Sequence, residues 1–313
     1  MMIERLRHPA SDIGLGALGI APAIDEVREV FPWAESVIAA AISYLPPRTD
    51  IVDGIPRGRV ARFAQSVDYH QVLRSKLEML SDAIRAEAPD SRIEICVDTV
   101  PLPERKLAML AGIAARGRNG NVFVDGCGSY AALGEIVTDL VLPPSEAVHA
   151  GFDACVGCDK CHQACPTGAI VGPGVVDASR CVSRLTQMSG VVPQELRSAI
   201  GDRIYGCDIC QEVCPLNEGI EPTSPEFAAE VFPGACPELI PLLLLSPAEF
   251  DACVRNSSIG WIRRARIRRN AAIAAGNLRC LEAVEPLITM LGDADPLLRV
   301  HAAWSLGEIR LEE

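Results

Sequence analysis

Apolar positions in the first half of the chain follow two different periods. An unbroken apolar run lies between two serines and predicts a buried strand over Ser36–Ser43. Tyr69–Glu87 instead spaces its apolar side chains at the helical period, with Asp68 placed to cap the first turn and Pro89 to stop the helix. Further strands are predicted over Arg92–Val97, Asn121–Val124 and Val137–Leu142, and a second helix over Glu104–Ala115. The pattern predicts an α+β fold class, with an α/β-type domain over residues 1–147.

The pattern changes twice in the second half of the chain. Residues 148–217 carry most of the cysteines among glycine- and proline-marked turns, and residues 218–250 contain six prolines, which predicts an irregular linker with little helix. Residues 251–313 become helical again, over Ile267–Gly276, Leu281–Leu291 and Pro296–Glu308. The last of these resembles a HEAT-repeat helix. One repeat or slightly more cannot form a solenoid, so this tail is predicted to pack on the rest of the chain.

Composition places the chain among ordinary globular proteins. Of its 313 residues 49% are hydrophobic and 22% charged, no run approaches a membrane span, and no signal-peptide pattern is visible. Thirteen cysteines, mostly grouped, indicate a reducing compartment, so we expect a cytoplasmic protein with no membrane association. The net charge of −12 argues mildly against general nucleic-acid binding. Five arginines within Arg263–Arg269 form either a solvated helix face or a surface for RNA phosphates.

Two cysteine runs carry the strongest chemical signal. The first is Cys155-x2-Cys158-x2-Cys161-x3-Cys165-Pro, and the second is Cys207-x2-Cys210-x3-Cys214-Pro. The first run has the bacterial ferredoxin spacing, in which the fourth cysteine ligates the other of two clusters. The chain is therefore predicted to hold two 4Fe–4S clusters in a ferredoxin-like module. Tetrahedral zinc is the alternative, because C-x2-C pairs also suit zinc.

The ferredoxin arrangement shares the ligands crosswise between the runs. The first three cysteines would take Cys214 as their fourth ligand, and Cys165 would join Cys207 and Cys210. Cys181 is the nearest unassigned thiol and would fill the remaining place. Two clusters this close predict an electron relay, which needs a terminal acceptor elsewhere in the protein or outside it.

Several further motifs occur in an order that resembles one known family. They are Gly58-Arg-Val-Ala-Arg-Phe-Ala, Asp68-Tyr-His, Val97-Asp-Thr-Val-Pro, Pro103-Glu-Arg, Gly117-Arg-Asn, Leu133-Gly-Glu-Ile-Val, Cys165-Pro-Thr-Gly-Ala-Ile, Ile204-Tyr-Gly-Cys-Asp-Ile-Cys and Arg269-Asn-Ala. Together with the HEAT-like tail, they resemble the epoxyqueuosine reductases, cobalamin-dependent tRNA-modifying enzymes related to reductive dehalogenases. The resemblance runs over most of the chain.

This resemblance implies an activity and a proton donor. Family members reduce the epoxide of epoxyqueuosine in the tRNA anticodon to the alkene of queuosine, with electrons passing from two clusters to a corrinoid. Asp98 matches the family's proton donor, a role that requires a dry pocket or a nearby negative charge. The apolar residues Ile95 and Val97 before it suit such a pocket. The alternative is that Asp98 only caps the loop before Pro101.

The resemblance also implies contacts with cobalamin. The matching positions are Arg62, His70, Asp98, Val122, Leu133 and Val182. His70 could serve as an axial ligand of cobalt, since histidine is the usual imidazole donor. Because the family does not need a protein axial ligand, a packing or hydrogen-bonding role is favoured for His70.

Three functions remain open from the sequence. The first is epoxyqueuosine reduction on tRNA by a monomer that takes electrons from an external low-potential donor. The second is a corrinoid reductase of the same construction acting on a small molecule, dehalogenation included. The third is a ferredoxin-like electron carrier whose helical tail docks a partner enzyme, which would need neither a corrinoid nor Asp98.

Overall fold

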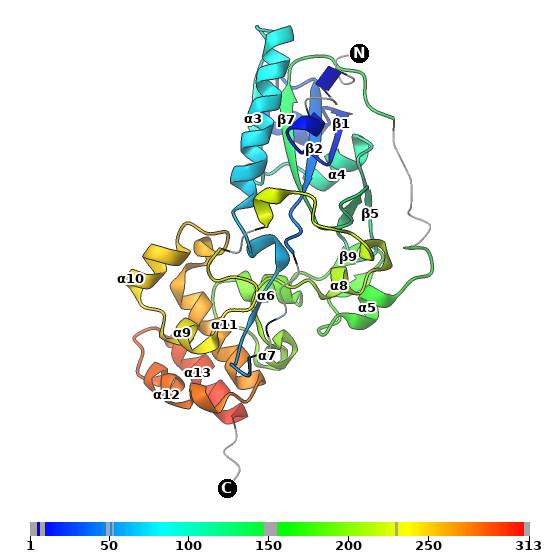
Figure 1. The fold of residues 1–313 in the computed structure, drawn as a ribbon. Coiled ribbons are helices and arrows are strands. Elements are labelled where there is room, and N and C mark those ends of the chain that lie inside the picture. Colours follow the sequence, from blue (N-terminus) through cyan, green and yellow to red (C-terminus); the bar gives the residue numbers. More distant parts are fainter. Residues whose placement is uncertain are drawn as a thin grey trace.

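The computed structural model describes residues 5–6, 10–47, 51, 53–146, 155–228 and 231–309. Figure 1 shows an elongated molecule with a sheet domain at one end, a C-terminal group of helices at the other, and the cysteine-bearing segments between them. The domain boundary predicted after residue 147 lies outside the described residues.

A four-stranded antiparallel sheet forms the first domain. Its order is β1 (Ala17–Pro22), β2 (Ser36–Ser43), β7 (Ala131–Thr138) and β4 (Ile93–Cys96). Every residue of β2 is buried, as its apolar run predicts. All three pairings in the sheet are antiparallel, which places the domain in the α+β class.

Helices cover both faces of this sheet. On one face, α3 (Tyr69–Glu87) packs Leu73, Leu77 and Leu80 against Ile38 and Ile136. On the other, α4 (Glu104–Leu110) packs Leu107 against Val37 and Val137. Burial on both faces explains why β2 is continuously apolar rather than alternating. The bounds and the Asp68 cap predicted for α3 are confirmed, since the Asp68 side chain accepts a hydrogen bond from the His70 amide.

Two predicted boundaries in this domain are wrong. The second helix ends at Leu110 and not at Ala115, because Gly112 adopts a φ of 74° and the chain then enters β5 (Ala114–Arg116). The strand predicted from Val137 begins instead at Ala131. Gly134 and Glu135 interrupt the apolar pattern there and conceal the first half of β7.

Further short elements lie between the strands of the sheet or follow it. They are α2 (Asp25–Val30), β3 (Arg59–Val60), β6 (Val122–Val124), α5 (Lys160–Ala164), β8 (Ile170–Gly172), β9 (Val175–Val176), α6 (Val182–Gln187), α7 (Gln194–Ile200), β10 (Arg203–Tyr205) and α8 (Ile209–Glu212). β3 pairs in parallel with β10. The Ala61 amide donates to the Tyr205 carbonyl at 2.8 Å, and the Val60 amide to the Ala235 carbonyl at 3.0 Å. The segment that contains β3 thus lies between two segments that come much later in the chain, one at Tyr205 and one at Ala235.

The predicted linker contains a buried helix. α9 (Leu239–Leu244) packs Leu239, Leu242 and Leu243 into the core of the tail. Pro241 lies in the first turn of α9, where backbone N–H groups have no acceptor within the helix, so the missing N–H of proline costs no hydrogen bond. Pro247 is the first residue of α10 (Pro247–Glu249) and is tolerated for the same reason. The prolines therefore start helices here, and the prediction of little helix was wrong.

The tail consists of α11 (Arg263–Asn277), α12 (Val284–Leu291) and α13 (Pro296–Glu308). As predicted, it packs on the rest of the chain. Four of the five clustered arginines make contacts within the chain, Arg263 being exposed. Arg264 donates to the Leu245 carbonyl, Arg266 to that of Gln187 and Arg268 to that of Leu243. Arg269 is fully buried. Neither a solvated face nor an RNA-binding surface describes these four side chains.

Candidate active site

A cavity of about 770 Å³ lies between the sheet domain and the cysteine-bearing segments. Of the residues predicted to contact a cofactor, Asp98, Val122, Leu133 and Val182 line it. Its volume is in the range of cofactor sites. The sheet domain contributes the carboxylate and part of the apolar wall, and the start of α6 closes the other side.

The structure brings the eight predicted cysteines together in two groups of four. Cys165, Cys181, Cys207 and Cys210 line the large cavity, whereas Cys155, Cys158, Cys161 and Cys214 line a smaller neighbouring one. These are the two groups that the crosswise prediction assigns. Among the described residues, no three histidine, cysteine or acidic side chains are arranged to hold a single metal ion.

The thiols differ in how readily they ionise. Burial opposes ionisation of Cys165, but hydrogen bonds from Thr167 and from the Ala169 amide lower its pKa below the usual value. Burial raises the pKa of Cys210 to about 12. Such a thiol becomes a thiolate only beside positive charge, which iron supplies when it binds.

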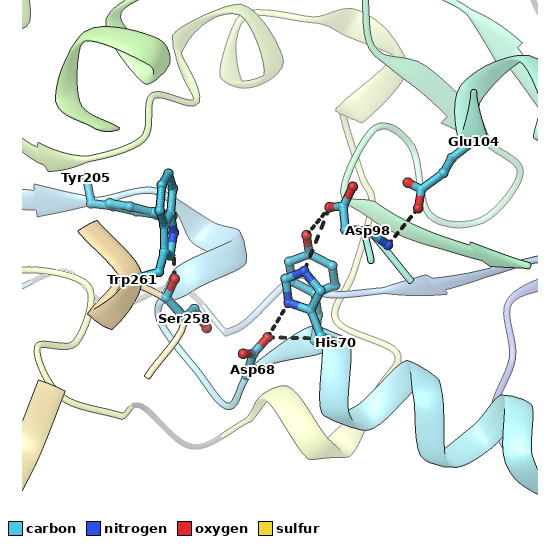
Figure 2. A network of polar contacts seen from close by, with 8 residues as sticks. Asp68, His70, Asp98, Glu104, Tyr205, Ser258 and Trp261 are labelled. Atoms are coloured by element: carbon cyan, nitrogen blue, oxygen red, sulfur yellow. Dashed lines mark hydrogen bonds and ion pairs between the residues drawn. The ribbon is translucent and has the colours of Figure 1, made fainter. Parts of the chain in front are cut away.

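Asp98 occupies the loop after β4 with a φ of 51°, a conformation uncommon for residues other than glycine. Its Oδ2 accepts a hydrogen bond from the Tyr69 hydroxyl at 2.6 Å. Its backbone amide donates to Glu104 Oε1 at 2.7 Å, and Figure 2 shows this contact between Asp98 and Glu104. The side chain is 56% exposed. The expectation of a dry pocket around Asp98 is therefore wrong, whereas an acidic neighbour is present in Glu104.

His70 lies beside Asp98 but does not line the cavity. Its Nδ1 is 2.6 Å from Asp68 Oδ1, its ring stacks on Tyr69 with centroids 4.0 Å apart, and its Nε2 is 3.8 Å from Asp98 Oδ2. The hydrogen bond with Asp68 raises the pKa of His70 above its usual value. These contacts agree with the hydrogen-bonding role favoured for His70, and the network is drawn in Figure 2.

Arg62 is also placed outside the lining of the large cavity. It lines a second cavity of about 700 Å³, on the other side of Cys207 and Asp208. Its guanidinium lies 5.2 Å from the centre of the Tyr130 ring, and its amide donates to Asp208 Oδ2 at 2.8 Å. The structure therefore gives Arg62 a role in positioning the segment that follows Cys207.

Two glutamates near Asp98 were missed by the sequence predictions. Glu104 lines the cavity, and burial together with the charge of Asp98 raises its pKa to about 7. Glu135 on β7 is fully buried, and neither of its carboxylate oxygens has a hydrogen-bond partner among the described residues. Burial raises the pKa of Glu135 well above its usual value, with Glu104 and Asp98 adding to the effect. The sequence feature that could have identified Glu135 is an acidic residue within an otherwise apolar strand.

Three family models match the chain. "Epoxyqueuosine reductase QueG, DUF1730" matches residues 25–99, "4Fe-4S double cluster binding domain" residues 154–217, and "HEAT repeats" residues 263–313. The second match supports iron–sulfur clusters rather than the zinc alternative. Epoxyqueuosine reductase from Bacillus subtilis (strain 168) is 37% identical over 294 residues, which cover 90% of this chain and 73% of that protein. This chain belongs to the epoxyqueuosine reductase family.

A second relative and three solved structures agree with this assignment. Epoxyqueuosine reductase from Escherichia coli (strain K12) is 36% identical over 285 residues, covering 90% of this chain and 74% of that protein. An epoxyqueuosine reductase solved with an epoxyqueuosine-modified tRNA-Tyr stem loop matches with a TM-score of 0.91 and 33% identity, covering 98% of this chain and 90% of that one. The Bacillus subtilis enzyme with its catalytic aspartate loop swung out of the active site gives 0.90 at the same identity and coverage. The Streptococcus thermophilus enzyme gives 0.87 at 30% identity, covering 99% and 90%.

Membership of the family establishes two points. The chain is an oxidoreductase, and the predicted combination of an α+β domain, a ferredoxin-like module and a HEAT-like tail is confirmed. Within the described residues, no helix combines the length and apolarity needed to cross a bilayer.

Proposed function

We propose that this chain reduces the epoxide of epoxyqueuosine in tRNA to the alkene of queuosine. One observation carries the proposal: a single cavity has Asp98 on one side and Cys165, Cys181, Cys207 and Cys210 on the other. A proton donor and an electron source thus face the same space. A ferredoxin-like carrier would have no use for an internal cavity of about 770 Å³ lined by an acid.

The eight cysteines would hold two 4Fe–4S clusters. Cys155, Cys158, Cys161 and Cys214 would ligate the first, and Cys165, Cys181, Cys207 and Cys210 the second. The donor chemistry fits, because thiolates at short spacing are the ligands of such clusters. The second group borders the cavity, so electrons from an external low-potential donor would reach the substrate side through it.

The cavity also fits a corrinoid. Val122, Leu133 and Val182 would form the apolar surface against which its ring packs. When bound, cobalamin would supply low-potential cobalt for the transfer of two electrons to the substrate carbon. His70 contributes no ligand in this scheme, because its side chain does not line the cavity.

Asp98 would donate a proton to the epoxide oxygen as a C–O bond breaks. The Tyr69 hydroxyl and the Glu104 carboxylate hold its loop from two sides. A similar enzyme has been seen with its catalytic aspartate loop swung out, and we infer that Asp98, in the loop after β4, is the corresponding residue of this chain. Its exposure to the cavity leaves the carboxyl accessible to a substrate.

The test uses the full-length chain, reconstituted anaerobically with iron, sulfide and cobalamin as a monomer. Asp98→Asn is expected to lower conversion of epoxyqueuosine-containing tRNA by at least about 10²-fold, the usual contribution of a positioned acid. Iron content and corrinoid absorbance should stay at wild-type levels. The exposed Asp90→Asn on the loop before β4 is the matched control and should convert normally.

Three other outcomes would contradict parts of the proposal. Undiminished conversion by Asp98→Asn would remove the proton-donor role. Corrinoid binding without tRNA conversion would favour a small-molecule substrate, dehalogenation included. A chain that holds clusters and retains no corrinoid would favour the electron carrier.

A further inference from the structure

The stoichiometry of the proposed reaction requires a second proton. Converting an epoxide to an alkene consumes two electrons and two protons and releases one water. The first proton goes to the epoxide oxygen when one C–O bond breaks, and the second allows the resulting hydroxyl to leave as water when the other C–O bond breaks. In the proposed reaction Asp98 would supply the first of these protons, and a second acid at the cavity would supply the other.

Glu104 is placed to be this group. It lines the same cavity as Asp98 and lies at the start of α4. Its Oε1 accepts the Asp98 amide at 2.7 Å, which fixes the carboxyl beside the donor loop. We propose that Glu104 donates the second proton, to the leaving hydroxyl. This inference rests on the proposed function and adds a residue to it.

The surroundings of Glu104 favour its protonated form. The ionisable groups around it are Asp98 from the loop after β4, Tyr69 and His70 from α3, Arg105 from α4, and Cys96 and Glu135 from β4 and β7. Arg105 donates to the Gly120 carbonyl, and its charge and that of His70 lower the pKa of Glu104 by less than burial and Asp98 raise it. Behind Glu104, Glu135 is buried without a partner in the described part of the chain, and such a carboxyl keeps its proton.

A pKa of about 7 suits the task. Burial, and then the negative charge that Asp98 carries when it has no proton, raise the pKa of Glu104 to this value. The group is therefore protonated in a large fraction of molecules near neutral pH, and it can be reloaded from water between turnovers. The protonated fraction falls as the pH rises through about 7, so the rate should fall with it.

The kinetic test compares Glu104→Gln with the wild-type chain. A glutamine can still accept the Asp98 amide, so the donor loop should keep its position. We expect conversion of epoxyqueuosine-containing tRNA to fall by about 10²-fold and the alkaline limb near pH 7 to disappear from the rate profile. Glu104→Asp should recover part of the rate and should keep an alkaline limb in its pH–rate profile. The exposed Glu94→Gln on β4 is the control and should keep both rate and limb.

An infrared titration tests the same residue without any substrate. The carboxylic-acid C=O band of Glu104 should vanish with a midpoint near pH 7 in the wild-type chain and be missing in Glu104→Gln. A wild-type chain that shows this band and fails to convert tRNA would refute the proposed function while supporting an ionisable acid at this position. An unchanged rate profile in Glu104→Gln, or the absence of any band lost near pH 7, would overturn the inference.

Discussion

Two buried ionisable side chains, at opposite ends of the molecule, have opposite surroundings. Glu135 in the sheet has no hydrogen-bond partner for either carboxylate oxygen within the described residues. Arg269 in α11 uses all its donors: Nη1 bonds to the Met188 and Gly190 carbonyls, Nη2 to those of Leu185 and Thr186, and Nε to Asn270 Oδ1. Both side chains are completely buried.

The difference determines which side chain keeps its charge. Burial lowers the pKa of Arg269 to about 10, so it stays protonated and its charge is distributed over carbonyl oxygens. Glu135 has nothing to stabilise its anion and is held neutral. The first is a structural clamp on the segment between Cys181 and Cys207, and the second is a neutral acid whose pKa is raised by burial and then by Glu104 and Asp98.

The largest expected effect follows from removing the clamp. Arg269→Met leaves the carbonyls at the end of α6 without donors and should lower the free energy of unfolding by about 3 kcal/mol or more. Since α6 follows Cys181 and β10 precedes Cys207, reconstituted iron content should also fall. Denaturant unfolding and iron analysis measure the two effects. The exposed Arg263→Met is the control, and equal unfolding midpoints for both variants would show that Arg269 is no clamp.

A change of opposite sign is expected at the other end. Glu135→Leu replaces an unpartnered carboxyl by an apolar side chain of similar size, and should raise the free energy of unfolding by about 1 kcal/mol. Chemical denaturation of the wild-type and variant chains measures the difference. Glu94→Leu on the exposed side of β4 serves for comparison. Destabilisation by Glu135→Leu would mean that the carboxyl has a stabilising partner after all.

A smaller effect should give the two ends opposite responses to pH. The raised pKa of Glu104 makes its contribution to stability complete below its usual value of 4.5, and this contribution is lost as pH rises through about 7. His301 in α13 is buried, and its Nε2 accepts the Val192 amide. Burial lowers its pKa to about 4, so its contribution is present above 6.5 and is lost as pH falls through about 4.

Amide hydrogen exchange, corrected for intrinsic rates, can resolve these two responses. Protection in the sheet domain should weaken from mildly acidic to mildly alkaline pH, and protection in α13 should weaken on acidification. Glu104→Gln should flatten the first trend, and His301→Gln the second. Parallel trends in both regions would contradict the contrast between the two ends.

The sequence predicted those parts of the fold in which one local rule dominates. The long period in α3 and the unbroken apolar run in β2 each gave correct bounds. The prediction failed for β7, where Gly134 interrupts the pattern. That glycine is needed because a Cβ there would come within 2.9 Å of Leu77 in α3. Tertiary packing of this kind is invisible in a local pattern.

In the candidate site, too, some residue positions could be predicted from a local sequence pattern and others depend on tertiary packing. The two groups of thiols could be predicted from the cysteine spacing together with the ferredoxin arrangement, in which the fourth cysteine of a run joins the other group. The placement of Arg62 and His70 depends on how three segments converge, and both residues lie outside the cavity lining. Arg269 looked like a member of a basic surface because its acceptors are backbone carbonyls, which carry no sequence signal.

The enclosure of β3 between two late segments has a consequence for how the protein is made. The Ala61 amide can form its hydrogen bond only after Tyr205 has been synthesised, and the Val60 amide only after Ala235 has been synthesised. During synthesis the sheet domain can assemble early, but this connection closes only after most of the chain has left the ribosome. Cysteines of both groups emerge before that closure, so a nascent chain exposes them to assembly factors and oxidants until the late segments arrive.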